Sequence, residues 1–196
     1  AEGLIYDMFD MDKHVLKAEP EATGDYIVSS DYGIQNATVF LLWQKEKEPT
    51  PDGDAYACLN EYRWSGREEN KQKTVKELAD GLQYELLNGI VPRLIYLDPS
   101  ATALKVELRK RGYKVQAADN DVLDGIADVA VMLSQNRLHF DKKKCKGTIK
   151  EFGLYRWDLK AADSGIDRPI KTDDHGMDAV RYFVKTMRLV NRNNEE

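Results

Sequence analysis

The sequence predicts an α/β domain in which a mixed β-sheet is flanked by helices. Three apolar runs come first and are joined by short polar connections, which is typical of an antiparallel meander. Short apolar strands then alternate with segments that repeat apolar residues at helical spacing. This order of elements favours a mixed sheet with helices packed on its faces.

The first three strands are expected at residues 26–31, 38–43 and 55–64. The first carries the apolar run Tyr26-Ile27-Val28 and ends at Asp31, and the second is the β-branched and aromatic run TVFLLW. The connection to the third strand, KEKEPTPDGD, contains two prolines and an Asp-Gly pair and therefore indicates a loop.

Helices and short strands are expected to follow. Ser65 and Glu68 have the spacing of a capping box, and the helix that they predict ends at the stop signal Asn88-Gly89. Ser100 is a candidate cap for the next helix, and Asn120 or Asp121 for the one after it. The remaining predictions are strands at 94–97, 114–116 and 138–140 and helices at 149–155 and 174–190.

Residues 1–24 are acidic, and we interpret them as a leader or linker ahead of a domain at 25–196. Tyr6, Phe9 and Val15 are the leader residues expected to pack on the domain. The chain has 42% hydrophobic and 32% charged residues, a net charge of −5 and no apolar run near the roughly 20 residues of a membrane span. We expect an intracellular protein with reduced cysteines and no membrane partner.

Three aspartates and one histidine are the candidate catalytic residues. Asp31 and Asp98 each end an apolar strand, and Asp178 lies three residues after His175 in the last helix. Strand ends in α/β sheets commonly carry sites, and carboxylates brought together there need cations because like charges repel. Hard divalent ions prefer oxygen ligands, and two of them about 3.5–4 Å apart can cleave a phosphodiester. One hypothesis for this spacing is metal-dependent phosphodiester hydrolysis, in which His175 binds a cation, orients water or shuttles a proton.

Each of these residues also has a structural interpretation. An aspartate at a strand end is often a turn residue, and Asp174 has the position of a helix N-cap. Asp119, Asp121, Asp124 and Asp128 form a second acidic group; a capped, solvated helix start explains it, although Asp124 stays a candidate. A lysine run either contacts DNA phosphates or forms a solvated loop; it comprises Lys142, Lys143, Lys144, Lys146 and Lys150. The negative net charge does not favour nucleic-acid binding, and no P-loop or zinc motif is present.

Six strings of the sequence carry a resemblance to a known family. They are the leader EGLIYDMFDMDKHV and then SSDYGIQNATVFLL, LIYLDPSA, ADNDVLDGI, EFGLYRWD and DRPIKTDDHGMDAVRYFV. In this order they resemble the C-terminal nuclease domain of phage large terminases, of the Bacillus-phage headful-packaging type, over nearly the whole chain. One string alone is moderately specific, whereas the full series is highly specific. Gly176 departs from the alanine that is common in the family.

The resemblance implies an RNase H-like fold and a two-metal endonuclease that uses Mg²⁺ or Mn²⁺. By motif, Asp31, Asp98 and Asp178 match the metal-binding acids, and His175 matches the histidine before the third acid. The implied substrate is concatemeric double-stranded viral DNA in the cytoplasm of the infected bacterial host. The implied partners are an ATPase domain in the same full-length chain, the portal and the small terminase subunit. Alternatives are a resolvase- or transposase-like nuclease on the same fold and a non-catalytic module that docks onto a portal or DNA.

Overall fold

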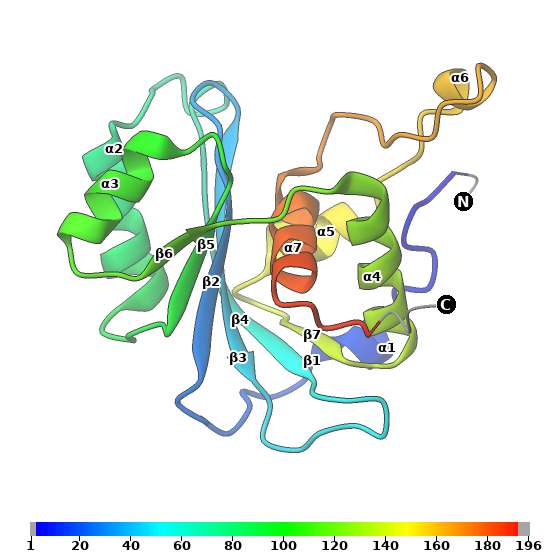
Figure 1. Ribbon diagram of the computed structural model, residues 1–196, viewed down its shortest axis with the longest axis horizontal. Helices are drawn as coiled ribbons and strands as arrows, with labels where there is room; N and C mark the ends of the chain where they lie inside the picture. The colour runs from blue at the N-terminus through cyan, green and yellow to red at the C-terminus, as the bar shows by residue number, and fades with distance from the viewer. Residues whose placement is uncertain (1–2, 192–196) are drawn as a thin grey trace.

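The computed structural model describes residues 3–191, in which a seven-stranded sheet lies between two layers of helices (Figure 1). The sheet begins with the predicted meander: β2 (Tyr26–Asp31), β3 (Ala37–Lys45) and β4 (Tyr56–Ser65) pair antiparallel. Apolar residues fill β3 because both of its faces are covered, so the whole strand is buried except at its ends. The predicted meander is confirmed.

Four short strands extend the sheet in parallel. On one side of the meander, β5 (Leu94–Leu97) pairs with β2, and β6 (Val115–Ala117) pairs with β5. On the other side, β7 (Leu138–Asp141) pairs with β4, and β1 (Val15–Leu16) pairs with β7. The strand order is β1-β7-β4-β3-β2-β5-β6, so the sheet is mixed and the predicted class is confirmed.

One face of the sheet is covered by α2 (Val75–Asp80), the π-helix η1 (Gly81–Leu87) and α3 (Thr102–Lys110). Side chains alternate between the faces of a strand, so Val28, Phe40 and Leu42 point into this layer. There they pack with the leucines of the helices, among them Leu82 and Leu104.

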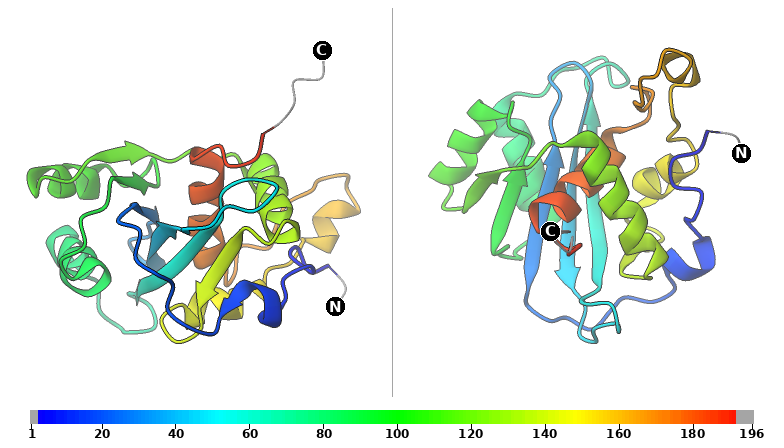
Figure 2. Two further views of the ribbon diagram at one scale, coloured as in Figure 1. Left: turned by 90° about the horizontal axis from the view of Figure 1, so that it is seen from below. Right: turned by 45° about the vertical axis from the view of Figure 1, so that its right-hand side comes forward.

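The opposite face is covered by α4 (Val122–Ser134), α5 (Lys146–Phe152) and α7 (His175–Thr186), as the two views of Figure 2 show. Ile27, Leu41 and Trp43 belong to this core. The Trp43 ring stacks on Phe183 of α7, with 4.2 Å between ring centroids, and fixes the helix across β2 and β3.

The N-terminal segment packs on the same layer. Tyr6 is 1% exposed, and the ring of Phe9 stacks on Phe152 of α5 with 4.1 Å between centroids. The short helix α1 (Met11–His14) follows and leads into β1, where Val15 is buried. The expected packing of Tyr6, Phe9 and Val15 is therefore confirmed. The division into a leader at 1–24 and a domain at 25–196 stays a prediction. Residues 1–2 and 192–196 of these two segments lie outside the described range.

Several predicted element boundaries are wrong. The Ser65 hydroxyl accepts the Glu68 N–H within a turn, and the helix begins only after Thr74, whose hydroxyl caps it. Ser100 donates its hydroxyl to Asp98 and does not cap α3. The helix expected at 149–155 begins at Lys146, the last helix ends at Thr186, and α1 and α6 (Leu159–Ala162) have no predicted counterpart. None of the helices in residues 3–191 has the length and apolar character needed to cross a membrane.

Candidate active site

Two of the predicted acids meet at one edge of the sheet. Because β2 and β5 are parallel neighbours with Ser30 opposite Leu97, the next residues, Asp31 and Asp98, leave the two strands at the same end. Asp31 is buried, whereas Asp98 is partly exposed and accepts hydrogen bonds from the backbone and hydroxyl of Ser100, both at 2.9 Å. The pairing of these two strands thus brings Asp31 and Asp98 to one edge of the sheet.

The last helix brings the other two predicted residues to the same edge. The Ser29 hydroxyl of β2 donates to the Ala179 carbonyl of α7 at 2.8 Å, which anchors the first turns of the helix to the strand that carries Asp31. The Nδ1 of His175 lies 2.9 Å from an Asp31 carboxylate oxygen, and Asp178 is 6% exposed one turn further along. Residues far apart in the chain are thus joined by a direct side-chain contact.

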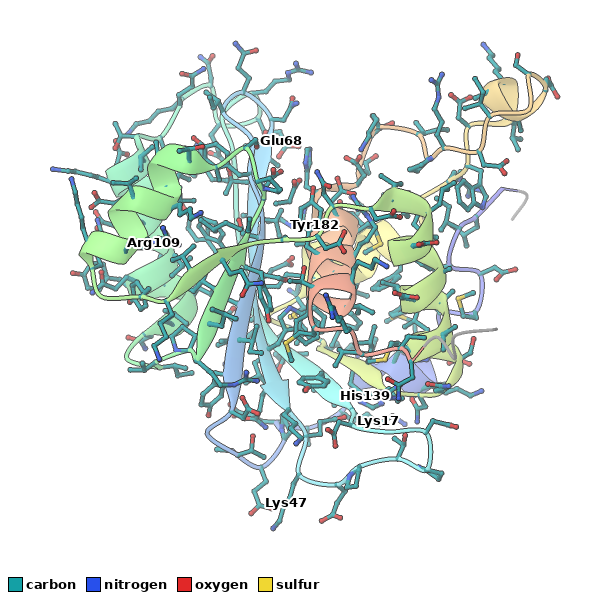
Figure 3. The ribbon with its side chains drawn as sticks, in the orientation of Figure 1. Lys17, Lys47, Glu68, Arg109, His139 and Tyr182 are labelled. Carbon is teal, nitrogen blue, oxygen red and sulfur yellow. The ribbon has the colours of Figure 1, made fainter. Side chains whose placement is uncertain are left out.

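All four predicted residues line one cleft of about 480 Å³. Tyr182 of α7 and Glu68 from the loop after β4 contribute to its wall, and both are labelled in Figure 3. The other charged residues of the lining are Arg67, Lys171, Asp173 and Asp174. The lining of the cleft is therefore predominantly acidic.

Burial dominates the electrostatics of the two inner carboxyls. It raises the pKa of Asp31, against the lowering effect of His175, and it raises the pKa of Asp178 to about 6, against that of Arg181. Asp98 and Asp174 add to the rise at Asp31, and Asp31 and Asp174 to the rise at Asp178. The hydrogen bond with Asp31 raises the pKa of His175. The acids are thus close enough to repel one another.

Cationic side chains of the protein lie among these acids. Arg181 donates to Asp178 at 3.1 Å, and the Lys171 Nζ is 3.9 Å from Asp178 and 3.7 Å from Asp174. As these side chains stand, no three or more His, Cys, Asp or Glu within residues 3–191 form a group able to hold a metal ion. The donor set of carboxylate oxygens still has the chemistry that hard divalent cations prefer.

Asp174 differs from its expected role. It occupies the N-cap position of α7, but its side chain makes no capping hydrogen bond. Instead its carboxylate is 5% exposed, lines the cleft and lies within ion-pair distance of Lys171. Sequence reasoning placed the residue correctly along the helix and gave its side chain the wrong contact.

The second acidic group lies outside the cleft. Asp121 is the N-cap of α4 and accepts the Asp124 N–H at 2.9 Å, which confirms one of the two caps proposed for this helix. Asp124 and Asp128 each lie 3.9 Å from the Lys185 Nζ. Neither lines the acidic cleft, so the structure does not bring Asp124 to the predicted site.

The predicted lysine run surrounds the start of α5. All five lysines are exposed, three of them in the turn after β7 and two on the helix. Lys150 lines a neighbouring cavity of about 270 Å³ that His175 and Asp173 also line. Lys150 and two residues of the acidic cleft therefore line the same neighbouring cavity.

Sequence reasoning missed a buried charged cluster behind the cleft. Arg63 of β4 donates to both Glu61 and Glu151, and the Glu151 side chain is 5% exposed. Burial raises the pKa of Glu151 to about 7, against the lowering effects of Arg63 and of the Gly176 N–H. This cluster joins β4 and α5 to the first turn of α7.

Comparison with known proteins places this fold among phage proteins. No protein-family model and no curated protein matches the chain. The large terminase of a thermophilic bacteriophage, also solved in complex with ADP, is 42% identical, with a TM-score of 0.87 over 96% of this chain and 46% of that chain. The chain thus spans about half of that protein's length.

Two separately solved nuclease domains share the fold at lower identity. The nuclease domain of the P22 large terminase is 19% identical, with a TM-score of 0.71 over 96% of this chain and 94% of that chain. The nuclease domain of the large terminase from bacteriophage SPP1, with bound Mn, is 17% identical, with a TM-score of 0.58 over 85% and 87% of the two chains. The expected RNase H-like fold is confirmed by these likenesses.

Proposed function

We propose that this chain, which belongs to the phage large terminases and shares the fold of their nuclease domains, is a metal-dependent endonuclease that cuts viral DNA during genome packaging. The observation that carries the proposal is the convergence of Asp31, Asp98, Asp178 and His175 on one cleft. The substrate is double-stranded concatemeric DNA, and the reaction is hydrolysis of its phosphodiester bonds.

Asp31, Asp98 and Asp178 are the residues that would hold two Mg²⁺ or Mn²⁺ ions. The bound Mn of the SPP1 nuclease domain supports a divalent ion in this fold. When bound, such ions activate a water molecule and stabilise the leaving oxygen of the phosphodiester. Lys171 and Arg181 lie against Asp178, one of these three carboxylates, so we expect the long, 69% exposed Lys171 side chain to rotate away on metal binding.

In this proposal, Asp31 orients the His175 ring and His175 transfers a proton. Asp31 fixes the His175 ring through Nδ1, which leaves Nε2 as the ring nitrogen that exchanges a proton with water or with the leaving group. Tyr182, at the wall of the cleft, limits where the sugar-phosphate backbone can lie.

The lysine run is the proposed DNA contact outside the cleft. Lys142, Lys143, Lys144, Lys146 and Lys150 are exposed and lie on the α5 side of the molecule. Phosphate contacts of this kind position a duplex without reading its sequence. They also offset the repulsion that a domain of net charge −5 exerts on DNA.

The full-length protein that we propose contains an ATPase domain as well. The large terminase of the thermophilic phage is about twice the length of this chain and has been solved with ADP, which supports a nucleotide-dependent motor in that relative. By analogy, the partners of this chain are that domain, the portal and the small terminase subunit, in the cytoplasm of the infected bacterium. Copurification of this chain with a phage portal would test the partner assignment, and its absence from every portal complex would refute it.

Substitution of the acids tests the proposed activity. In the presence of Mn²⁺, Asp31→Asn and Asp178→Asn are each expected to abolish plasmid cutting because each removes a charged oxygen ligand. Asp124→Asn is the matched control, since Asp124 lies outside the cleft and should leave cutting at the wild-type level. Equal cutting by the wild type and both active-site variants would sink the proposal.

Two alternative functions give different results in the same system. A resolvase- or transposase-like enzyme on this fold would prefer branched DNA, so a four-way junction would be cut faster than linear duplex. A non-catalytic docking module would cut neither substrate, and Mn²⁺ would not raise its melting temperature. The acids in the cleft favour the endonuclease because a docking module has no need for like charges brought together in a buried position.

A further inference from the structure

Helix α7 carries two of the four proposed active-site residues, yet its N-cap side chain does not cap it. The first N–H groups of a helix have no partner within the helix and need acceptors from elsewhere. An aspartate at this position usually accepts one of them. Here the Asp174 carboxylate lines the cleft, so the acceptor must come from another element.

That acceptor is Glu151 of α5. The Gly176 N–H lies 3.2 Å and 3.0 Å from the two Glu151 carboxylate oxygens. A carboxylate also interacts favourably with the partial positive charge at the N-terminal end of a helix. Glu151 therefore takes the role that the sequence assigns to Asp174.

Glu151 is itself fixed by a buried network. Arg63 of β4 donates to Glu151 and, at 3.1 Å, to Glu61. Glu61 in turn accepts the N–H and the hydroxyl of Thr148, at 3.1 Å and 2.8 Å, in the first turn of α5. The position of the Glu151 carboxylate is thus set by a central strand of the sheet and by α5 together.

Gly176 is the residue that allows this contact. A Cβ at position 176 would lie 2.6 Å from the Arg63 Nη2 and 2.7 Å from the Thr148 Oγ1, and closer still to a Glu151 oxygen. Separations under 3 Å at a Cβ require neighbouring atoms to move. The cluster therefore approaches the backbone of α7 directly, and a methyl group at position 176 would displace the ends of these side chains.

We propose that Glu151 is a positioning residue of the active site: it caps α7 from α5, which frees the Asp174 carboxylate to face the cleft and fixes His175 and Asp178 opposite Asp31. This inference rests on the proposed nuclease function. His175 and Asp178 flank Gly176 in the same helical turn, so loss of the cap would displace side chains that we propose act on the metal ions. Substitution of a residue that orients metal ligands typically costs about 10–100-fold in metal affinity or activity.

The test compares Glu151→Ala and Glu151→Gln with a control that removes a charged pair far from the cleft. The control is Glu107→Ala, which removes an ion pair with Arg111 at 3.1 Å in the α2–α3 layer, on the opposite face of the sheet. Two quantities are measured for each protein: the Mn²⁺ affinity without DNA, by electron paramagnetic resonance, and the Mn²⁺ concentration that gives half-maximal plasmid cutting. Melting temperatures are recorded without metal.

Glu151→Ala is expected to weaken Mn²⁺ binding about tenfold or more and to raise the half-maximal Mn²⁺ concentration in parallel. Glu151→Gln should recover much of the loss because its amide oxygen still accepts the Gly176 N–H. Glu107→Ala should lower the melting temperature without changing either Mn²⁺ measurement. Equal Mn²⁺ affinities for Glu151→Ala and Glu107→Ala would overturn the proposal.

A second variant covers the case in which Glu151→Ala does not fold. Gly176→Ala pushes the carboxylate away from the helix while keeping Glu151, and it should weaken Mn²⁺ binding in the same way; wild-type affinity in this variant would refute the inference. Failure of the nuclease function gives a different outcome, because the wild-type protein itself would then not cut DNA.

Discussion

Asp31 and Asp178 are carboxyl groups that the fold holds under 10% exposed and close to further acids. A carboxylate in such surroundings loses hydration and is repelled by its neighbours, and both effects favour the protonated form. His175 and Arg181 offset part of this cost through direct contacts. The remaining cost is the physical reason to expect that divalent cations bind here.

The pKa shifts predict how metal binding depends on pH. Because the folded-state pKa of Asp178 is raised to about 6, the folded protein holds more protons than the unfolded chain between the ordinary aspartate value and about 6. Its stability without metal therefore falls as the pH rises through that window, and the raised pKa values of Asp31 and His175 act in the same direction. Metal requires the deprotonated carboxylates, so the increase in melting temperature on adding Mn²⁺ should be larger at about pH 8 than at about pH 5.

Thermal melts with and without Mn²⁺ at the two pH values measure this difference. Asp31→Asn serves as the control, since it should lose most of the Mn²⁺-dependent increase in melting temperature at both pH values. A Mn²⁺-dependent increase that is as large at the lower pH would contradict the assignment of these carboxyls as ligands.

At the residue level, the sequence was sufficient for the acids and insufficient for their surroundings. The positions of Asp31 and Asp98 could be predicted because Asp31 ends one apolar strand and Asp98 directly follows another, and those of Asp178 and His175 because their spacing puts them on one helix face. The contacts of Glu151 could not be predicted, because its partners Arg63 and Gly176 are distant in the chain. Glu61 and Arg63 are two residues apart in a strand and therefore lie on the same face. This spacing predicts that they form a charged pair, but it does not predict that Glu151 joins them.

At the scale of elements, local propensity predicts the strands well and the helix starts less well. The strands at 26–31 and 94–97 have the predicted bounds because buried apolar runs between turn residues leave little choice of register. Ser65 and Ser100 both have cap-like spacing, but their hydroxyl groups bond within turns. Such competition between turn and helix is decided by tertiary packing, which the sequence pattern does not contain.

The basic segment between β7 and α5 is the element whose role is most open to experiment. We predict that replacing Lys143, Lys146 and Lys150 with Gln weakens duplex DNA binding and makes it less dependent on salt, by about 0.9 in the logarithmic slope for each lysine–phosphate ion pair that the substitutions remove. The matched control replaces Lys76, Lys110 and Lys114, three exposed lysines around the α2–α3 layer, and should leave the slope unchanged. Fluorescence anisotropy over a salt series gives both slopes; identical slopes for the two triple variants would show that this segment is a solvated loop.

At the scale of the whole molecule, the sheet order brings the site together. The interior strand β2 has β3 on one side and β5 on the other, and α7 crosses its face, so elements from distant parts of the chain meet at Asp31, the last residue of β2. The N-terminal segment packs on the same layer through Tyr6, whose buried ring lies 5.8 Å from that of Tyr155. The N-terminal segment is thus in direct contact with the layer that holds α7.

The distribution of charge over the molecule explains how a chain with a negative net charge could bind DNA. A net charge of −5 argues against DNA binding only if charge is spread evenly over the surface. Here several acids are gathered in one cleft, whereas five lysines lie together beside α5. Binding of two divalent ions in the cleft would neutralise most of the surplus, which is why composition alone could not decide the function.

The most direct test of the two-metal site is a crystal structure of the protein grown with Mn²⁺, in which anomalous scattering locates the ions. We expect two peaks in the acidic cleft, about 3.5–4 Å apart and within ligand distance of Asp31, Asp98 and Asp178, with the Lys171 Nζ displaced from its present position. A cleft without Mn²⁺, in crystals of a protein that cuts DNA, would contradict the two-metal site.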